Sequence, residues 1–299
     1  MATYFAFSDE SGKYKKERSD KFILKNPFYC RSVVLIRTDE WMRLREEFTS
    51  LARELLHLEP PIGLKWSYIW SLYKHRQKRE KIPPSKPYSS LKQYSLDKLI
   101  EFVRKILQKM RDTESSRIIL TLTFNERKIT GSWEEKEILK KHLSHALKMI
   151  EKQMEEGKDD LCAIFFNQEE PALEKKLKLA FQELFKEKGA EKYPRIKDSL
   201  CFELSPYGTG SILADYCAGV FNGCLRLYPQ SIDLFQNQVW PKIIKEKSEA
   251  LGAGITEIPK NKKNRGLLTK LLSRVFTVEE KNFKVSAEER LRVKKSVPH

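Results

Sequence analysis

The chain has 299 residues, 40% of them hydrophobic, and its 57 Lys and Arg outnumber its 41 Asp and Glu, which gives a formal net charge of +16. Domains usually span about 100–200 residues, so this length allows one large or two small domains with a buried core. The surplus of positive charge predicts a polyanionic partner, with nucleic acid (DNA or RNA) first because its binding releases counterions. The alternative is a lysine-rich solubilising surface.

Membrane segments and disulfide or zinc scaffolds are not expected. No stretch reaches the ~18–20 apolar residues of a membrane span, and no apolar leader follows Met1, so we expect a cytoplasmic protein without membrane contact. None of the five cysteines forms a CxxC pair, and all lie in apolar runs. They are interpreted as small buried hydrophobic residues in a reducing compartment.

The first half of the chain predicts strands and then helices. An aromatic run at 2–8 and a β-branched run at 27–37 predict strands, and a helix with apolar residues at helical spacing is expected from Thr38. Residues 62–66 are also strand-like. The basic, proline-bearing stretch 76–90 predicts an exposed loop.

The second half alternates strands with helices. The patterns predict strands at 116–125, 161–166 and 200–204, and helices at 91–112, 133–156, 171–188, 211–227 and 240–250. A basic linker at 258–265 precedes a partly helical, basic tail.

This order of elements predicts an α/β fold, a mixed sheet with helices on both faces. Antiparallel leading strands followed by alternating strands and helices match an RNase H-like layout, and several other α/β folds as well. We expect an RNase H-like domain over 1–228 with a helical insertion at about 66–113, and a helical, basic C-terminal extension over 229–299.

The first strand ends in an acidic pair, Asp9 and Glu10. A carboxylate at the end of a rigid strand can hold Mg²⁺ with precision. Neighbouring strand residues point to opposite faces, and Asp9 shares its face with Phe5 and Phe7. We therefore expect Asp9 to be a metal ligand and Glu10 to assist it; the alternative is an ordinary acidic turn.

A second candidate acid, Asp215, lies near the start of the helix expected from Ser211. The helix dipole stabilises a carboxylate there. Small residues share its side of the helix, so another backbone can approach closely: Ser211, Ala218, Gly219 and Asn222. A buried acid needs a compensating metal or cation, and the alternative to a metal site is a buried salt bridge.

Three segments together resemble a known family. FSDESG at 7–12, LKWS at 64–67 and LADYCAG at 213–219 are similar to the signature of the family called domain of unknown function 3800. Its members begin with a strand that ends in Asp-Glu-Ser-Gly and close the domain with a helix that carries Ala-Asp. The resemblance covers roughly residues 3–227. It implies an RNase H-like fold with acidic metal ligands, of which Asp9 and Asp215 are the outer two.

The resemblance also implies an acid at the end of the strand before the 171–188 helix, where this chain has Asn167. Asn can ligate through its carbonyl oxygen but brings no charge. Either Glu169 or Glu170 replaces the missing acid from the turn, or the metal site is weakened.

Basic residues are the candidates for nucleic-acid contact. Lys65, at an expected strand end near Asp9, can contact a phosphate or orient an acid, or it is an ordinary surface lysine. Basic segments at 74–86, 260–265 and 290–295 are interpreted as backbone contacts or as solvated loops. The residues expected to bind nucleic acid are Lys65, Lys78, Arg79, Lys262, Lys263 and Arg265.

His142 and His145 lie three positions apart on an expected helix, a spacing that can bind metal, but no acid completes the set and packing roles are favoured. The hypothesis is therefore a metal-dependent nuclease or polynucleotidyl transferase that uses Mg²⁺ or Mn²⁺, with Asp9, Glu10, Asp215, Lys65 and Asn167 at its site and Asp9, Asp215 and Glu169 as ligands. The alternative is a catalytically impaired module of the same fold that binds nucleic acid, a partner protein or a second copy of itself.

Overall fold

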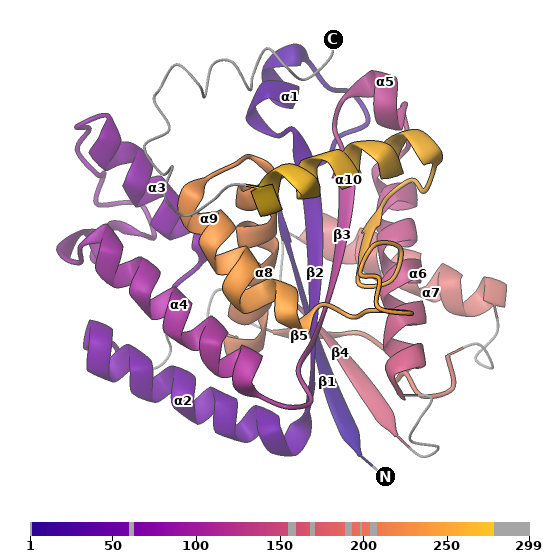
Figure 1. The fold of residues 1–299 in the computed structure, drawn as a ribbon, viewed down its shortest axis with the longest axis horizontal. Helices are drawn as coiled ribbons and strands as arrows, with labels where there is room; N and C mark the ends of the chain where they lie inside the picture. Colours follow the sequence, from indigo (N-terminus) through magenta and orange to yellow (C-terminus); the bar gives the residue numbers. More distant parts are fainter. Residues whose placement is uncertain are drawn as a thin grey trace.

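The computed structural model describes residues 2–59, 63–154, 160–167, 171–188, 193–197, 199–203 and 208–277. Its strands form one six-stranded sheet in the order β5-β4-β1-β2-β3-β6 (Figure 1). The strands are β1 (Thr3–Ser11), β2 (Phe28–Arg37), β3 (Arg117–Phe124), β4 (Leu161–Asn167), β5 (Cys201–Glu203) and β6 (Ile255–Glu257).

The sheet is mixed, as the sequence predicted. β1 pairs with β2 and β2 with β3 in antiparallel register. On the other side of β1, β4 and then β5 add in parallel, and β6 adds in parallel to β3. The α/β class and the mixed sheet are therefore confirmed.

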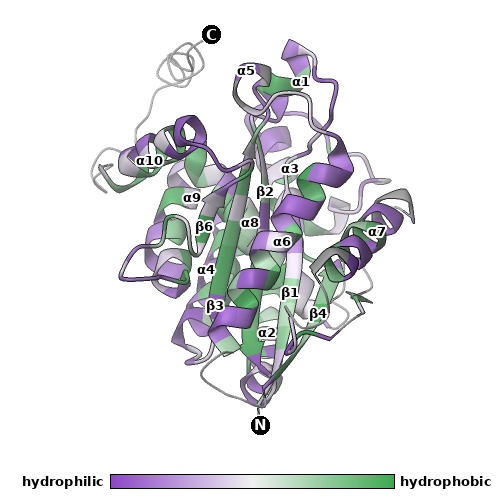
Figure 2. Cartoon of the chain, turned by 90° about the vertical axis from the view of Figure 1, so that its right-hand side faces the viewer, coloured by the Kyte–Doolittle hydropathy of each residue, from purple (hydrophilic) through white to green (hydrophobic). Residues whose placement is uncertain are grey.

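Helices cover both faces of this sheet. The described helices are α1 (Asp20–Lys25), α2 (Thr38–Leu56), α3 (Trp66–Gln77), α4 (Leu96–Asp112), α5 (Arg127–Thr130), α6 (Glu135–Met154), α7 (Pro171–Lys188), α8 (Thr209–Leu225), α9 (Pro229–Leu234) and α10 (Lys262–Thr277). One apolar core joins the sheet to α2, α3, α4 and α8, and a second joins the opposite face to α6 and α7. Figure 2 shows hydrophobic strands between helices whose outward faces are hydrophilic.

The centre of the first core is α8. Almost all of its side chains are buried, and it packs directly on β1 and β2. Gly210 allows this approach, because a Cβ atom built there would lie 2.1 Å from the ring of Phe7. The Ser32 hydroxyl donates a hydrogen bond of 2.6 Å to the Ala214 carbonyl and fixes the helix against β2.

Three sequence-based assignments were wrong. Residues 63–65 form no strand, and α3 begins at Trp66; residues 60–62 lie outside the described part of the chain. The helix expected from residue 91 begins at Leu96, where the Ser95 hydroxyl accepts from the Lys98 amide and caps it. The helix expected over 240–250 is only a short 3-10 turn at Trp240–Lys242.

Residues 229–277 are the described part of the expected helical extension, and this part joins the same sheet. It supplies β6, which pairs with β3, and the amphipathic helix α10, which packs on the first core through Leu268 and Leu272. Within the described ranges, no helix is long and apolar enough to cross a membrane.

Candidate functional site

The alternation of side chains along β1 separates Asp9 from Glu10. Asp9 faces the core that contains α8, and only 4% of it is exposed. Glu10 points to the opposite face, where its carboxylate accepts a hydrogen bond of 2.6 Å from the Tyr29 hydroxyl and pairs with the buried Arg31. The structure therefore places Glu10, expected to assist Asp9, in a structural ion pair on the other side of the sheet.

Asp9 has neighbours in register on the next two strands. The paired residues Ser8 and Phe166 immediately precede Asp9 and Asn167 on the parallel strands β1 and β4. Asn167 in turn pairs with Glu203 of β5. Because side chains alternate along each strand, Asp9, Asn167 and Glu203 form a row across one face of the sheet.

Helix α8 brings Asp215 to this row. Asp215 is 6% exposed, and its Oδ2 accepts a hydrogen bond of 2.5 Å from the Trp66 amide at the start of α3. The neighbouring Tyr216 hydroxyl donates to the Leu64 carbonyl over 2.7 Å. Gly219, one turn later, lets Trp66 approach, because a Cβ atom there would lie 2.1 Å from the indole ring. The small residues beside Asp215 thus permit the close contact that the sequence predicted.

The electrostatics show that the two acids share one buried site. Burial raises the pKa of Asp9 to about 8, and the nearby Asp215 carboxylate raises it further than its other neighbours do. The Lys65 ammonium opposes this effect and lowers the pKa of Asp9, which places Lys65 close to the pair. Lys65 lies half-buried at the N-terminus of α3, so its charge adds to the positive end of that helix.

Two side chains of the row carry polar atoms that find no partner among the described residues. Asp9 Oδ2 is buried without a hydrogen bond, and so are both amide atoms of Asn167. Buried polar groups are almost always satisfied in folded proteins, so these atoms indicate a missing ligand or water. Oxygen atoms of carboxylates and amides are the donors that Mg²⁺ and Mn²⁺ prefer, and the residues present therefore fit such an ion.

The ligand set is smaller than a full acidic cluster. Within the part of the chain that the structure describes, no three His, Cys, Asp or Glu side chains group closely enough to hold one metal ion. On β4, next to Asp9, the row carries the neutral Asn167. Glu169 and Glu170, the expected replacements, lie outside the described residues.

Glu203 is the site residue that sequence reasoning missed. Its Oε2 accepts hydrogen bonds from the Ser211 amide (2.9 Å) and hydroxyl (2.5 Å), which hold the start of α8 against β5. The available signal was an acid in the otherwise apolar run LCFEL at 200–204, directly before the loop that leads to the Asp215 helix.

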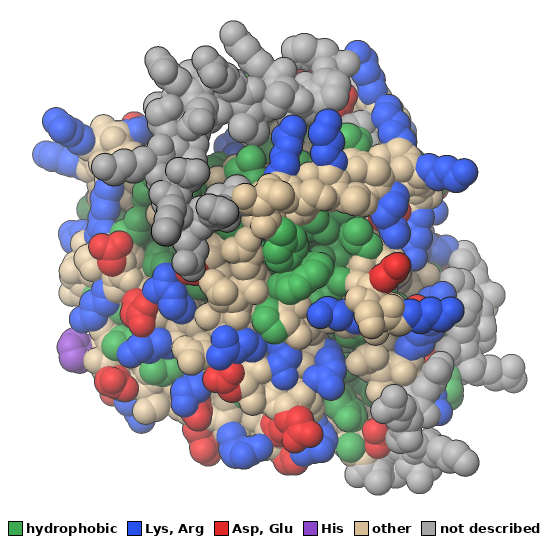
Figure 3. Space-filling model, in the orientation of Figure 1, with side chains coloured by type: hydrophobic (Ala, Val, Ile, Leu, Met, Phe, Trp, Pro, Cys, Tyr) green, Lys and Arg blue, Asp and Glu red, His purple; other side chains and the backbone are tan. Residues whose placement is uncertain are grey.

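The predicted nucleic-acid residues have different surroundings. Lys78, Arg79 and Lys262 are exposed, and Lys78 lies 3.7 Å from Glu80. Lys263 donates to the Lys128 carbonyl (3.2 Å). Arg265 is engaged in an ion pair of 2.6 Å with the buried Glu257, which leaves it less available to a phosphate. Figure 3 shows Lys and Arg side chains along α10 and around the outer end of α3.

The two helix histidines pack in the opposite core. His142 is fully buried between the hydroxyls of Thr121 (2.5 Å) and Thr123 (2.8 Å). His145 contacts the Ala253 carbonyl through Nε2 (2.8 Å), and its Nδ1 lies 3.2 Å from the Lys260 ammonium, so the neutral ring with the proton on Nε2 satisfies both contacts. Burial and the Lys260 charge lower the pKa of His145 to about 4.

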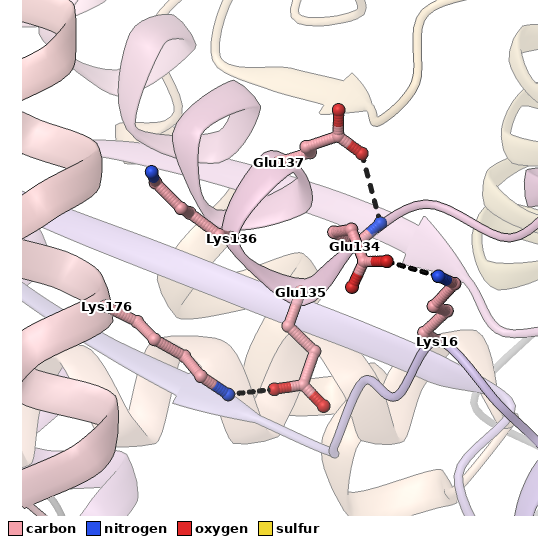
Figure 4. A pocket seen from close by; sticks show the side chains of 6 residues that line it. All are labelled: Lys16, Glu134, Glu135, Lys136, Glu137 and Lys176. Carbon is pink, nitrogen blue, oxygen red and sulfur yellow. Dashed lines mark hydrogen bonds and ion pairs between the residues drawn. The ribbon is translucent and has the colours of Figure 1, made fainter.

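A shallow surface pocket at the start of α6 is a poor candidate for a ligand site. Its lining is three lysines and three glutamates: Lys16, Glu134, Glu135, Lys136, Glu137 and Lys176. Figure 4 shows these side chains paired with one another, Lys16 with Glu134 and Lys176 with Glu135. Lys136 pairs with Glu183 outside the pocket. The charges are balanced and already compensated.

The chain was compared with protein families, curated proteins and solved structures. No protein-family model, no curated protein and no solved structure matches this chain.

Proposed function

We propose that this chain is a metal-dependent enzyme that acts on phosphodiester bonds of nucleic acid, a nuclease or polynucleotidyl transferase with an RNase H-like fold. The observation that carries the proposal is the meeting of Asp9 and Asp215 in one buried site, beside Asn167 on the adjacent strand. The antiparallel strands β1–β3 followed by the parallel strands β4 and β5 support the fold, as does the resemblance of three segments to domain of unknown function 3800.

The roles of the chain's own residues follow from their positions. Asp9, Asp215 and the Asn167 amide oxygen would hold Mg²⁺ or Mn²⁺, which when bound supplies an activated water and charge stabilisation at a phosphoryl group. Asp215 also fixes the start of α3 through the Trp66 amide, and so sets the position of Lys65. Lys65 supplies a positive charge beside the carboxylates, where it can bind and orient a phosphate.

A cleavage assay tests the proposal. Purified protein is incubated with Mg²⁺ or Mn²⁺ and end-labelled single-stranded and duplex DNA and RNA. We expect cleavage or strand transfer of at least one substrate, lost in EDTA and lost in Asp9→Asn and in Asp215→Asn. Lys148→Gln, a change to an exposed basic residue of α6 outside the carboxylate site, is the matched control and should keep its activity. If the wild type and Asp9→Asn give identical products on every substrate, the enzyme proposal is wrong.

The second candidate is a nucleic-acid-binding module of the same architecture without catalysis. Asn167 favours it, because a neutral ligand weakens the hold on a divalent cation. Calorimetric titration separates the two: the enzyme proposal expects saturable binding of Mn²⁺ that depends on Asp9, and no heat at millimolar Mn²⁺ favours the module.

A further inference from the structure

Three aromatic rings form a continuous cluster where α3 meets the end of α8. Trp70 stacks on Tyr73 of the same helix, with ring centroids 4.9 Å apart and an angle of 25°. It also meets Tyr228, just before α9, at 4.5 Å. All three rings are half-buried rather than enclosed in the core. Figure 1 shows α3 beside α9 at the outer part of the fold. Each of the three side chains therefore keeps part of its surface exposed to solvent.

Positively charged side chains surround these rings. The Arg226 guanidinium lies 5.1 Å over Tyr228. Partial burial lowers the pKa of Lys74, which is next to Tyr73, and the nearby charges of Arg226 and of Lys25 in α1 lower it further. Among the described residues, no carboxylate lies within ion-pairing distance of Lys25, Lys74 or Arg226. Like charges that gather without counter-charges are relieved when a polyanion binds.

We call this surface the α3 strip: Lys25, Trp70, Tyr73, Lys74, Arg226 and Tyr228. The strip and the carboxylate site share helix α3, which starts at Trp66, whose amide donates to Asp215. At a rise of about 1.5 Å per residue, Lys74 lies about 12 Å along the helix axis from Trp66. A stacked strand advances about 3.4 Å per nucleotide, so this distance corresponds to roughly three or four nucleotides.

We propose that the α3 strip binds single-stranded nucleic acid and leads the strand to Asp9 and Asp215. Bases stack on Trp70, Tyr73 and Tyr228, while phosphates lie against Lys74 and Arg226. Aromatic faces select unpaired bases, because the bases of a duplex stack on one another and expose only their edges. The inference rests on the proposed function, and it adds the strandedness of the substrate and its path to the site.

Fluorescence anisotropy tests the strip in EDTA, where no metal-dependent cleavage occurs. The probes are labelled single-stranded DNA, single-stranded RNA and duplex DNA of equal length and mixed sequence. We expect at least one single strand to bind about tenfold more tightly than the duplex. Stacking on a protein ring contributes about 1–3 kcal/mol per base, so Trp70→Ala should weaken single-strand binding about 5- to 150-fold, and Trp70→Phe should retain most of it.

The salt dependence of binding tests the charges of the strip with matched substitutions. The slope of log K against log salt is negative, and Lys74→Gln and Arg226→Gln should each make it less steep by about 0.7, the value for one phosphate contact on a single strand. Lys148→Gln removes the same charge from an exposed position of α6, on the opposite face of the sheet, and should leave the slope unchanged. Circular dichroism of each variant verifies that it is folded.

Three results would overturn the α3 strip: equal affinity for single strands and duplex, unchanged binding by folded Trp70→Ala, or an equal loss in Lys148→Gln and Lys74→Gln. The binding arm is independent of the cleavage assay. Strip-dependent binding without cleavage overturns the proposed function alone, and Asp9-dependent cleavage with binding unaffected by Trp70→Ala overturns the strip alone.

Discussion

Replacing Asp9 by asparagine should make the metal-free protein more stable. Asp9 is 4% exposed, its Oδ2 has no hydrogen-bond partner among the described residues, and the Asp215 carboxylate is close by. When ionised, Asp9 buries a charge. When protonated, it holds a proton that the unfolded chain does not hold at neutral pH. Asparagine avoids both costs, keeps an oxygen for the Glu10 amide, and can donate its Nδ2 hydrogens to Asp215.

The magnitude follows from the same geometry. A buried polar atom without a partner costs about 1–3 kcal/mol. The raised pKa of Asp9 sets an upper limit. The pKa rises from 3.8 in the unfolded chain to about 8 in the folded protein. Between pH 3.8 and neutral pH, a span of about three units, each unit costs the folded protein about 1.4 kcal/mol, or about 4 kcal/mol in total. We therefore expect the free energy of unfolding of Asp9→Asn to exceed that of wild type by about 1–4 kcal/mol.

Urea unfolding in EDTA at neutral pH, followed by circular dichroism, measures this difference. Asp215→Asn is the informative comparison, because Asp215 accepts the Trp66 amide at the N-terminus of α3. Loss of that charged contact should lower the free energy of unfolding by about 1–2 kcal/mol, a change of opposite sign. Excess Mn²⁺ should raise the stability of wild type more than that of Asp9→Asn. If Asp9→Asn is less stable than wild type in EDTA, the buried Asp9 carboxyl group does not carry the cost that we derive.

Four further substitutions should have distinct effects. Asn167→Asp adds a charge to the ligand set and should tighten Mn²⁺ binding about tenfold in calorimetry, because the affinity of a divalent cation rises with the charge of its oxygen ligands; weaker binding would contradict the assignment. The pKa of His145 falls from 6.5 to about 4 in the folded protein, so its neutral form contributes stability that is complete above pH 6.5 and lost as the pH falls towards 4. His145→Gln should therefore remove up to about 3 kcal/mol of acid destabilisation in that window, and an unchanged pH profile would speak against it. Gly219→Ala must displace Trp66 and should lower the free energy of unfolding by about 1–3 kcal/mol in urea unfolding. Gly266→Ala, in open space on α10, should raise it by up to about 1 kcal/mol, and equal effects of the two substitutions would refute the packing argument.

Local sequence patterns predicted most of the sheet. The β-branched run at 27–37 and the apolar run at 161–166 became β2 and β4, because burial of such runs between helices leaves few other conformations. The patterns failed where tertiary contacts decide. Leu64 and Trp66 look strand-like, but the bonds from Tyr216 and Asp215 of α8 hold this segment as the entry to a helix.

The same distinction applies to the candidate site. Asp9 could be selected from the phase of β1, whereas Glu10, which we expected to assist it, pairs with Arg31 on the other face of the sheet. The acid in the run LCFEL marks Glu203 as unusual, but the position of Glu203 beside Asn167 depends on the pairing of β5 with β4. The position of Tyr228 likewise depends on its packing against Trp70, which is distant in the sequence. Sequence periodicity reports which face a side chain takes, but not which other element that face meets.

The most direct test of the central claim is anomalous diffraction from crystals soaked in Mn²⁺. We expect one strong peak bounded by Asp9, Asp215 and Asn167, with ligand oxygens about 2.0–2.6 Å from the ion. The peak should be absent from crystals of Asp9→Asn prepared in the same way. A fully occupied Mn²⁺ elsewhere, with none between these three residues, would contradict the assignment of this site to metal-dependent chemistry.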